Sequence, residues 1–213
     1  MIIIDVEQGS PDWHAYRCGR VTASRVADVM AKTKSGWGAS RANYAAELIA
    51  ERLTGVPATG FTSPAMQWGV DTEPKARLVY AMVQDVEVQK VGIVQHPTLS
   101  MSCASPDGLV GDDGMVEIKC PTVATHIETL LGEAVPGKYV LQMQWQMACA
   151  ERKWCDFVSY DPRLPGEMQL FVRRVPFDPE VARDLAANIG QFLAEIDDKI
   201  ERLVAKYGIK DAA

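Results

Sequence analysis

The sequence predicts a layered α/β fold in which a central group of five strands is preceded and followed by helices; an α+β arrangement of the same elements is the alternative. Apolar residues recur at every third or fourth position in the outer parts of the chain and at alternate positions in the middle. Glycine and proline separate these stretches, and no internal repeat is present. With 213 residues, 47% of them apolar, the chain can bury the core of one domain, and its composition excludes a disordered, collagen-like or coiled-coil protein.

Four helices are expected before the strands. Ser10 and Pro11 provide an N-cap and a first-turn proline for the first helix, a threonine can cap the second, and Gly55 closes the third. The fourth could run unbroken or be interrupted near Gly69 or Pro74. The predicted ranges are 12–18, 22–31, 41–54 and 64–83.

The alternating pattern begins at Val86. Two strands are expected within 86–109, joined by a turn at His96-Pro97, and a glycine-rich turn over 111–114 precedes the third. The remaining strands and the helices between them are predicted at 115–120, 123–131, 138–150, 154–160 and 168–175.

The last element is a long amphipathic helix over 178–207. Asp178 and Pro179 provide its cap and first-turn proline, apolar residues follow at spacings of three or four, and Gly208 ends it. Residues 32–40, in contrast, are polar and glycine-rich, and we expect them to form an exposed mobile loop.

Targeting and cysteine patterns exclude several classes of protein. The first residues form too short an apolar run for a secretory signal, and no stretch approaches the ~20 apolar residues of a membrane span, so we expect a cytoplasmic protein without membrane contact. The five cysteines include no Cys-x-x-Cys pair, which argues against a zinc, cluster or disulfide framework. We expect five reduced thiols, at Cys18, Cys103, Cys120, Cys149 and Cys155.

The charge distribution is uneven. The net charge is −6, which by itself argues against a nucleic-acid partner. Residues 17–52, however, carry seven Lys or Arg against three Asp or Glu, so this segment is +4 and the remainder −10. An acidic chain of this kind can still present a positive face to DNA.

The strongest chemical signal is Asp107 followed, across a turn, by Glu117, Ile118 and Lys119. Residues two apart on a strand share a face, so Glu117 and Lys119 point one way and Ile118 the other. Charges that point inward from a central strand are seldom present unless they are paired or bind a metal. Two carboxylates with nearby main-chain oxygens form the site that Mg²⁺ or Mn²⁺ prefers.

This hypothesis depends on strand register. A four-residue turn over 111–114 would place Asp107 opposite Ile118 and on the wrong face. The first strand must therefore bulge or end near residues 106–108 for Asp107 to join Glu117. In isolation, an Asp-Gly turn and an edge-strand ion pair between Glu117 and Lys119 would be the more common explanation.

Seven short blocks of sequence, in order over most of the chain, favour the metal site over the turn and ion pair. They resemble the lambda-type phage alkaline exonucleases, the YqaJ-like viral recombinase family of the PD-(D/E)xK nuclease superfamily. The blocks are Asp12-Trp13-His14, Arg17 to Ser24, Trp68-Gly69 with Glu73, Ser105 to Leu109, Glu117 to Pro121, Tyr139 with Gln142 and Gln144, and Tyr160 to Arg163.

The resemblance implies a restriction-endonuclease-like PD-(D/E)xK core, with a mixed central sheet flanked by helices, in a single exonuclease domain over 1–213. It implies that Asp107, Glu117 and the main-chain oxygen of Ile118 bind Mg²⁺, for which Mn²⁺ can substitute. Asp107 would bridge to a second ion, and two such ions activate the attacking water and stabilise the leaving oxygen.

The resemblance also implies catalytic roles for two further residues, Lys119 and Glu73. Lys119 corresponds to the residue that holds or deprotonates the attacking water. Glu73 corresponds to an additional acidic residue near the metals that acts through water, with a solvated helix carboxylate as its alternative.

Arg17, Ser24, Ser105 and Gln142 match the positions that hold a terminal 5′-phosphate in this family. Arginine and neutral donors suit phosphate oxygens. Taken singly, Arg17 would be a surface ion-pair residue, Ser24 an early helix residue and Gln142 a polar helix position.

Three residues match positions that contact DNA. Met66 corresponds to an apolar wedge between the separating strands, with a core methionine as the alternative. Lys34 falls near a position that tracks the duplex. Trp37 could stack on a base or dock on the protein.

The resemblance thus implies a Mg²⁺-dependent 5′-to-3′ exonuclease that digests one strand of linear double-stranded DNA from a 5′-phosphorylated end. It would release 5′-mononucleotides and leave a 3′ single strand for phage-type recombination in the bacterial host cytoplasm. A homotrimeric ring and a single-strand annealing recombinase partner are also implied. The alternatives are a restriction-like endonuclease on the same core and a catalytically inactive DNA-binding protein.

Overall fold

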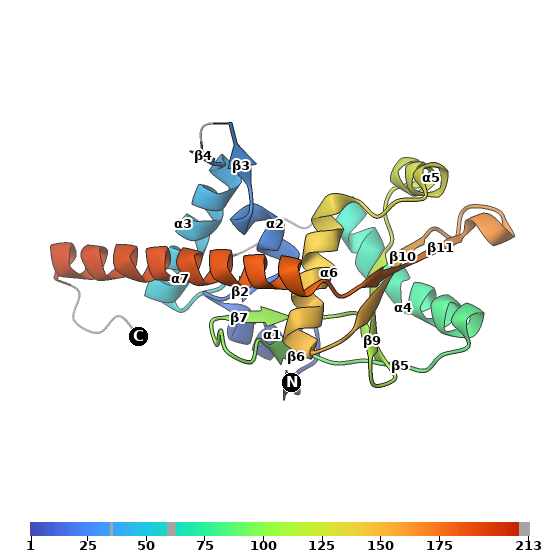
Figure 1. Cartoon of the computed structure of the whole chain (residues 1–213), viewed down its shortest axis with the longest axis horizontal. Coiled ribbons are helices and arrows are strands. Elements are labelled where there is room, and N and C mark those ends of the chain that lie inside the picture. Colours follow the sequence, from blue (N-terminus) through green and yellow to red (C-terminus); the bar gives the residue numbers. More distant parts are fainter. Residues whose placement is uncertain (35, 59–62, 209–213) are drawn as a thin grey trace.

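The computed structural model describes residues 1–34, 36–58 and 63–208, and it shows the mixture of helices and sheets that the sequence predicts (Figure 1). The α-helices are α1 (Pro11–Arg17), α2 (Val26–Val29), α3 (Ala39–Thr54), α4 (Pro64–Gln84), α5 (Val123–Gly132), α6 (Gly137–Ala150) and α7 (Pro179–Tyr207). The strands are β1 (Ile2–Ile4), β2 (Val21–Thr22), β3 (Lys32–Thr33), β4 (Gly36–Trp37), β5 (Val88–Gln89), β6 (Ile93–Gln95), β7 (Ser102–Ala104), β8 (Gly108–Val110), β9 (Gly114–Lys119), β10 (Trp154–Tyr160) and β11 (Leu170–Pro176).

The larger sheet has the order β11-β10-β9-β8-β5, in which β9 and β10 are parallel and the other neighbours antiparallel. Helix α4 covers one face, where Tyr80 is buried in the same cluster as Val116 and Ile118. Helix α6 covers the other face, where Tyr139 stacks on Phe157 of β10 with ring centroids 5.6 Å apart. The central strand β9 is therefore enclosed on both faces, as its apolar residues predict.

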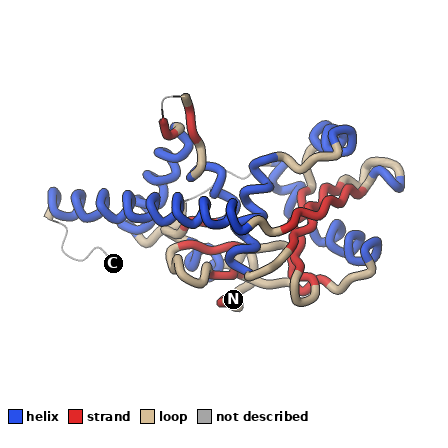
Figure 2. Tube along the Cα trace, viewed as in Figure 1, coloured by secondary structure: helices blue, strands red, loops and turns tan. Residues whose placement is uncertain are grey.

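Helix α7 begins and ends within a residue of the predicted positions. Asp178 accepts hydrogen bonds from the backbone N–H groups of Glu180 and Val181, and Gly208 ends the helix with φ 64°. Its apolar stripe packs on the core beside α3, and its C-terminal part extends beyond the sheets (Figure 2). No helix in the described ranges is both long and apolar enough to cross a membrane.

Segment 86–109 differs from the prediction. It forms four short strands instead of two, because its middle and its ends join different sheets. Strands β6 and β7 form a hairpin around the predicted turn at His96-Pro97, in a second sheet of order β1-β6-β7-β2. Strands β5 and β8 pair with each other in the larger sheet. Alternation of apolar residues marks extended chain but does not say which sheet it enters.

Other local predictions were wrong at their boundaries or type. Residues 22–31 form a 3₁₀ turn, Ala23–Arg25, and the single turn of α2. The expected loop at 32–40 contains the hairpin β3-β4 and the start of α3. Helix α4 continues through Pro74, since the packing of its buried residues on the sheet offsets the lost hydrogen bond. All five cysteines are free thiols, as expected.

Gly92 allows the N-terminal strand to pair with β6, an element that the sequence did not predict. A Cβ atom at Gly92 would lie 2.1 Å from the carbonyl oxygen of Val6 and 2.8 Å from that of Ile4. We expect Gly92→Ala to lower the free energy of unfolding by roughly 2 kcal/mol or more, because backbone rather than side chain must move. Urea unfolding measures this change.

Gly190 provides the control for this prediction. It lies inside α7, and a Cβ atom there meets nothing within 4 Å. Gly190→Ala should be neutral or stabilising by up to about 1 kcal/mol, because alanine favours helix. Equal effects of the two substitutions would contradict the close approach at Gly92.

Candidate active site

The turn between β8 and β9 brings Asp107 beside Glu117. Val110 pairs with Gly114 and Gly108 with Val116, so the turn contains three residues, 111–113, and the predicted four-residue turn is wrong. Extending this register by one residue places Asp107 opposite Glu117. Strand β8 begins only at Gly108, which agrees with the condition that the strand end near residues 106–108. Asp107 Oδ2 accepts a hydrogen bond from the backbone N–H of Ile118 at 2.6 Å.

Glu117 is the most enclosed of the predicted site residues, with 2% of its surface exposed. Its Oε1 accepts a hydrogen bond from Gln142 Nε2 at 2.6 Å and pairs with Lys119 Nζ. Its Oε2 accepts from Gln146 Nε2, also at 2.6 Å. Ile118 packs on the α4 side of the sheet, so Glu117 and Lys119 share the opposite face, as the strand period predicts.

Asp107, Glu117, Glu73 and Lys119 form a carboxylate cluster in which burial and neighbouring charges shift the pKa values of Asp107 and Lys119. Burial raises the pKa of Asp107 well above its ordinary value, and the neighbouring Glu117 and Glu73 raise it further. Burial lowers the pKa of Lys119, but Glu117 and Asp107 raise it by more, so the lysine remains a cation. The ring of Tyr139 lies 5.0 Å from Lys119 Nζ and closes this side of the cluster.

Glu73 reaches the same cluster from α4. It pairs with Arg77 one turn later on the helix, and Arg77 Nε donates to the main-chain oxygen of Asp107 at 3.0 Å. Burial raises the pKa of Glu73, while Arg77 opposes the shift. Arg77 therefore ties Glu73 to the Asp107 segment, a role that the sequence did not predict.

The donor set fits a divalent cation of the Mg²⁺ type. Asp107 and Glu117 supply hard carboxylate oxygens, and a bound cation would relieve their mutual repulsion. In the described part of the chain, no group of three His, Cys, Asp or Glu side chains is arranged to hold a metal ion. A cation at Asp107 and Glu117 would therefore need main-chain oxygen and water as well, which is the usual environment of Mg²⁺.

Arg17 and Ser105 lie together near this cluster. Arg17 Nη1 donates to Ser105 Oγ at 3.3 Å, and Trp13 Nε1 donates to the same oxygen at 2.9 Å. The guanidinium lies over the Trp13 ring, 3.9 Å from its centroid. Burial lowers the pKa of Arg17, and among the described residues it forms no ion pair. An uncommitted, partly desolvated arginine is suited to an anion.

Arg17, Ser24 and Met66 line one cavity of about 340 Å³. Ser24 Oγ lies 3.3 Å from Thr22 Oγ1, and Met66, in the first turn of α4, is exposed rather than in the core. Gln142, the fourth residue predicted at the phosphate, donates a hydrogen bond to Glu117. The four predicted residues therefore extend from this cavity to the carboxylate cluster.

Lys34 and Trp37 belong to the β3-β4 hairpin, which projects from the body near α3 (Figure 1). Lys34 is exposed in the turn of this hairpin. Trp37 docks on the protein through Arg41, whose guanidinium is 4.0 Å from the Trp37 centroid and 4.6 Å from that of Phe192. Trp37 remains partly exposed, so its docking leaves room for other contacts.

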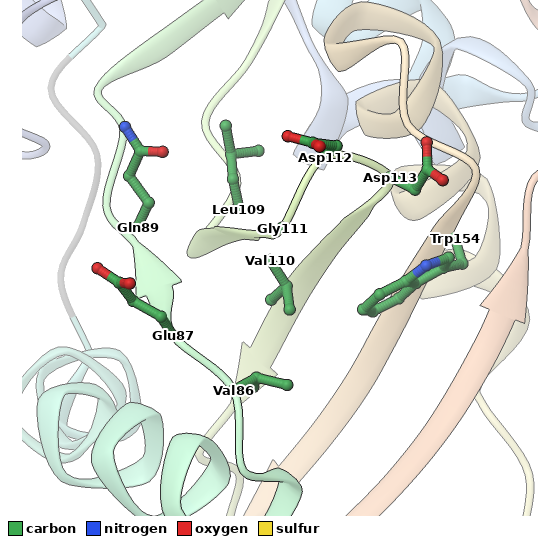
Figure 3. Close-up of a pocket in the computed structure, with 9 residues that line it drawn as sticks. All are labelled: Val86, Glu87, Gln89, Leu109, Val110, Gly111, Asp112, Asp113 and Trp154. Atoms are coloured by element: carbon green, nitrogen blue, oxygen red, sulfur yellow. The ribbon is translucent and has the colours of Figure 1, made fainter.

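A second cavity, of about 710 Å³, opens at the turn end of β8 and β9 (Figure 3). Glu87, Asp112, Asp113 and Trp154 line it, and none of the predicted site residues does. Its carboxylates would repel phosphate, so the geometry supports no nucleic-acid site there.

A mixed sheet between two helices, with Asp107 directly before β8 and with Glu117 and Lys119 on the adjacent β9, is the arrangement of a nuclease of the PD-(D/E)xK type. The profile of the YqaJ-like viral recombinase domain matches residues 12–153. No curated protein is similar enough to count as a match. The chain belongs to the YqaJ-like viral recombinase family and is an exonuclease of that family.

Solved structures agree with this assignment. The chain resembles an alkaline exonuclease, LHK-Exo from Laribacter hongkongensis, with 49% identity and a TM-score of 0.88, over 93% of this chain and 98% of that one. The same values hold for LHK-Exo in complex with dAMP. A phage-related exonuclease from Haemophilus somnus 129PT shares the fold, with 14% identity and a TM-score of 0.67 over 88% of this chain and 96% of that one.

Sequence reasoning missed Gln146 as well as Arg77. Gln142 and Gln146 are separated by four positions on a helix, which places them on one face. This spacing could have predicted that Gln146 lies beside Gln142 at the site. Arg77 stands in the same relation to Glu73, and the i,i+4 ion pair could have been predicted from it.

Proposed function

We propose that this exonuclease requires Mg²⁺ and digests one strand of linear double-stranded DNA in the 5′-to-3′ direction from a 5′-phosphorylated end. It would release 5′-mononucleotides and leave a 3′ single strand. The observation that carries the proposal is the placement of Asp107, directly before β8, beside Glu117 and Lys119 of β9: Asp107 accepts from the N–H of Ile118, and Glu117 pairs with Lys119. Mn²⁺ should substitute for Mg²⁺ because both prefer oxygen ligands.

Asp107, Glu117 and the main-chain oxygen of Ile118 would hold the cation. When bound, the cation supplies charge stabilisation and a more acidic water for phosphodiester hydrolysis. Lys119, a cation on the same face as Glu117, would orient the attacking water. Glu73 would accept a hydrogen bond from water at the edge of the cluster, with Arg77 fixing its position.

Arg17, Ser24, Ser105 and Gln142 would hold the terminal 5′-phosphate. The contact between Arg17 and Ser105, two residues before Asp107, supports an anion site next to the proposed hydrolytic site. The binding of dAMP by the similar LHK-Exo agrees with a pocket for a nucleoside monophosphate. Terminal-phosphate recognition favours an exonuclease over a restriction-like endonuclease, which needs no such pocket.

The remaining contacts and partners are proposed from family resemblance. Met66, exposed at the rim of the Arg17 cavity, would separate the strands, and Lys34 and Trp37 would contact the duplex. A homotrimeric ring around the DNA would allow processive digestion, and a single-strand annealing recombinase would receive the 3′ strand. This reaction would take place in the bacterial host cytoplasm.

Hydrolysis of matched DNA substrates in Mg²⁺ and in chelator tests the proposal. We expect linear duplex DNA to be degraded in Mg²⁺, faster from a 5′-phosphate than from a 5′-hydroxyl, and closed circular DNA to survive. Excess EDTA should abolish hydrolysis, and added Mg²⁺ or Mn²⁺ should restore it.

Other outcomes would identify the alternatives. Cleavage of the circle at a rate similar to that of the linear DNA would indicate an endonuclease. Binding of linear DNA without hydrolysis in any divalent cation would indicate an inactive DNA-binding protein. Hydrolysis that persists in EDTA would contradict the role given to Asp107 and Glu117.

A further inference from the structure

Gln146 has no part in the function proposed above, yet it contacts the centre of the carboxylate cluster. Its Nε2 donates to Glu117 Oε2 at 2.6 Å, and Gln142 Nε2 donates to Oε1 at 2.6 Å. Each oxygen of Glu117 is thus held by a separate amide from one face of α6. Gln146 is 1% exposed, so it cannot itself contact DNA.

Packing does not explain a glutamine at this position. Gln146 Oε1 is buried without a hydrogen-bond partner in the described part of the chain, and an unsatisfied buried acceptor is costly. The adjacent Trp145 and Met147 are buried and apolar, and an apolar residue at 146 would avoid this cost. Glu117 accepts but does not donate when ionised, so the Nε2 end of the amide must face it. The structural reason for an amide at position 146 is therefore its hydrogen bond to the Glu117 carboxylate.

We propose that Gln146 is a positioning residue that holds the Glu117 carboxylate in the orientation that binds the divalent cation. This inference rests on the proposed function, because it presupposes a cation at Asp107 and Glu117. Without Gln146, the carboxylate is free to turn towards Lys119, with which it already pairs through Oε1. The cation would then lose a well-oriented ligand, while DNA binding would be unaffected.

Two substitutions remove the contact in different ways. Gln146→Met retains the volume without a donor, and Gln146→Asn retains the amide but is one methylene too short to reach Glu117. We expect both to weaken Mn²⁺ binding to the DNA-free protein, measured by calorimetry, by about 10- to 100-fold. The Mn²⁺ concentration for half-maximal hydrolysis should rise in parallel, and the KM for DNA at saturating Mn²⁺ should change by less than about 2-fold.

Gln144 provides the matched control on the same helix. It is 3% exposed, its Nε2 donates to the main-chain oxygen of Pro176 at 2.8 Å, and its Oε1 accepts from the N–H of Asp178 at 2.9 Å. These contacts link α6 to the start of α7 and do not involve the carboxylates. Gln144→Met should lower the thermal midpoint and leave Mn²⁺ affinity unchanged.

Unchanged Mn²⁺ affinity in folded Gln146→Met or Gln146→Asn would overturn the inference, as would an equal loss in Gln144→Met. If Gln146→Met does not fold, Gln146→Asn decides. A wild-type protein that neither binds Mn²⁺ nor needs a divalent cation would instead contradict the proposed function itself. The metal dependence of the wild type therefore distinguishes the two failures.

Discussion

Asp107→Asn is expected to lower the rate of DNA hydrolysis by at least about 10³-fold, because charge stabilisation by a bound divalent cation contributes several kcal/mol and each 1.4 kcal/mol is a factor of ten. Asparagine retains the shape of the side chain and an oxygen that can accept from the N–H of Ile118. In metal-free buffer the variant should be at least as stable as the wild type, because the substitution removes a charge that Glu117 and Glu73 repel. Single-turnover hydrolysis and thermal unfolding measure the two effects.

Asp113→Asn is the control in the same hairpin. Asp113 is exposed in the β8-β9 turn and pairs with Lys153 at 3.0 Å. Its loss should leave activity unchanged within about 2-fold, since an exposed ion pair contributes little to the free energy of unfolding. Asp107→Asn that remains within 10-fold of wild-type activity would contradict a cation site at Asp107.

Arg17→Ala is expected to reduce kcat/KM on 5′-phosphorylated linear DNA by about 10- to 100-fold, because hydrogen bonds to charged groups contribute roughly 1.5–3 kcal/mol. The rate on 5′-hydroxyl DNA should change far less, so the preference for the phosphate disappears. The physical reason is that Arg17 is half-buried, touches Ser105 and forms no ion pair among the described residues. Initial rates on the two substrates measure the preference.

Arg25 offers a control arginine that lines the same cavity. Its guanidinium is already paired, with Asp28 at 2.6 Å and with Glu47 at 3.0 Å. Arg25→Ala should therefore leave the preference for a 5′-phosphate in place. An equal fall on both DNA ends in Arg17→Ala would show that Arg17 acts on general DNA binding or on folding instead.

The elements predicted best are those with a long periodic pattern of apolar residues and with ends marked by neighbouring residues in the sequence. The stripe of α7 and the alternation of β9 each repeat over several turns or residues, and local chemistry marks their ends. The short strands β1, β2 and β5 carry two or three residues each, too few for a period to be recognised. Strands β1 and β2 pair with β6 and β7, which are distant in sequence, and this is why the second sheet was not predicted.

The candidate site shows the same division. The order of the sequence blocks predicted that Asp107, Glu117, Lys119 and Arg17 belong to one site, and the family comparison confirms the class of enzyme. Their individual roles stay predictions until the substitutions above are made. The contact of Arg77 with the Asp107 backbone was missed because it depends on how α4 packs beside residue 107, which no sequence motif encodes.

That Glu117 and Lys119 share a face follows from the sequence alone, because a strand alternates its side chains whatever surrounds it. The sequence also contains the residue types that suit a hard cation. The position of Asp107 beside them depends on the strand register seen in the folded protein, since a turn shorter by one residue moves every side chain of the strand to the other face. The two amides that hold Glu117 come from a helix 25 and 29 positions away in sequence, and the packing of α6 on the sheet, which no local pattern encodes, brings them into contact.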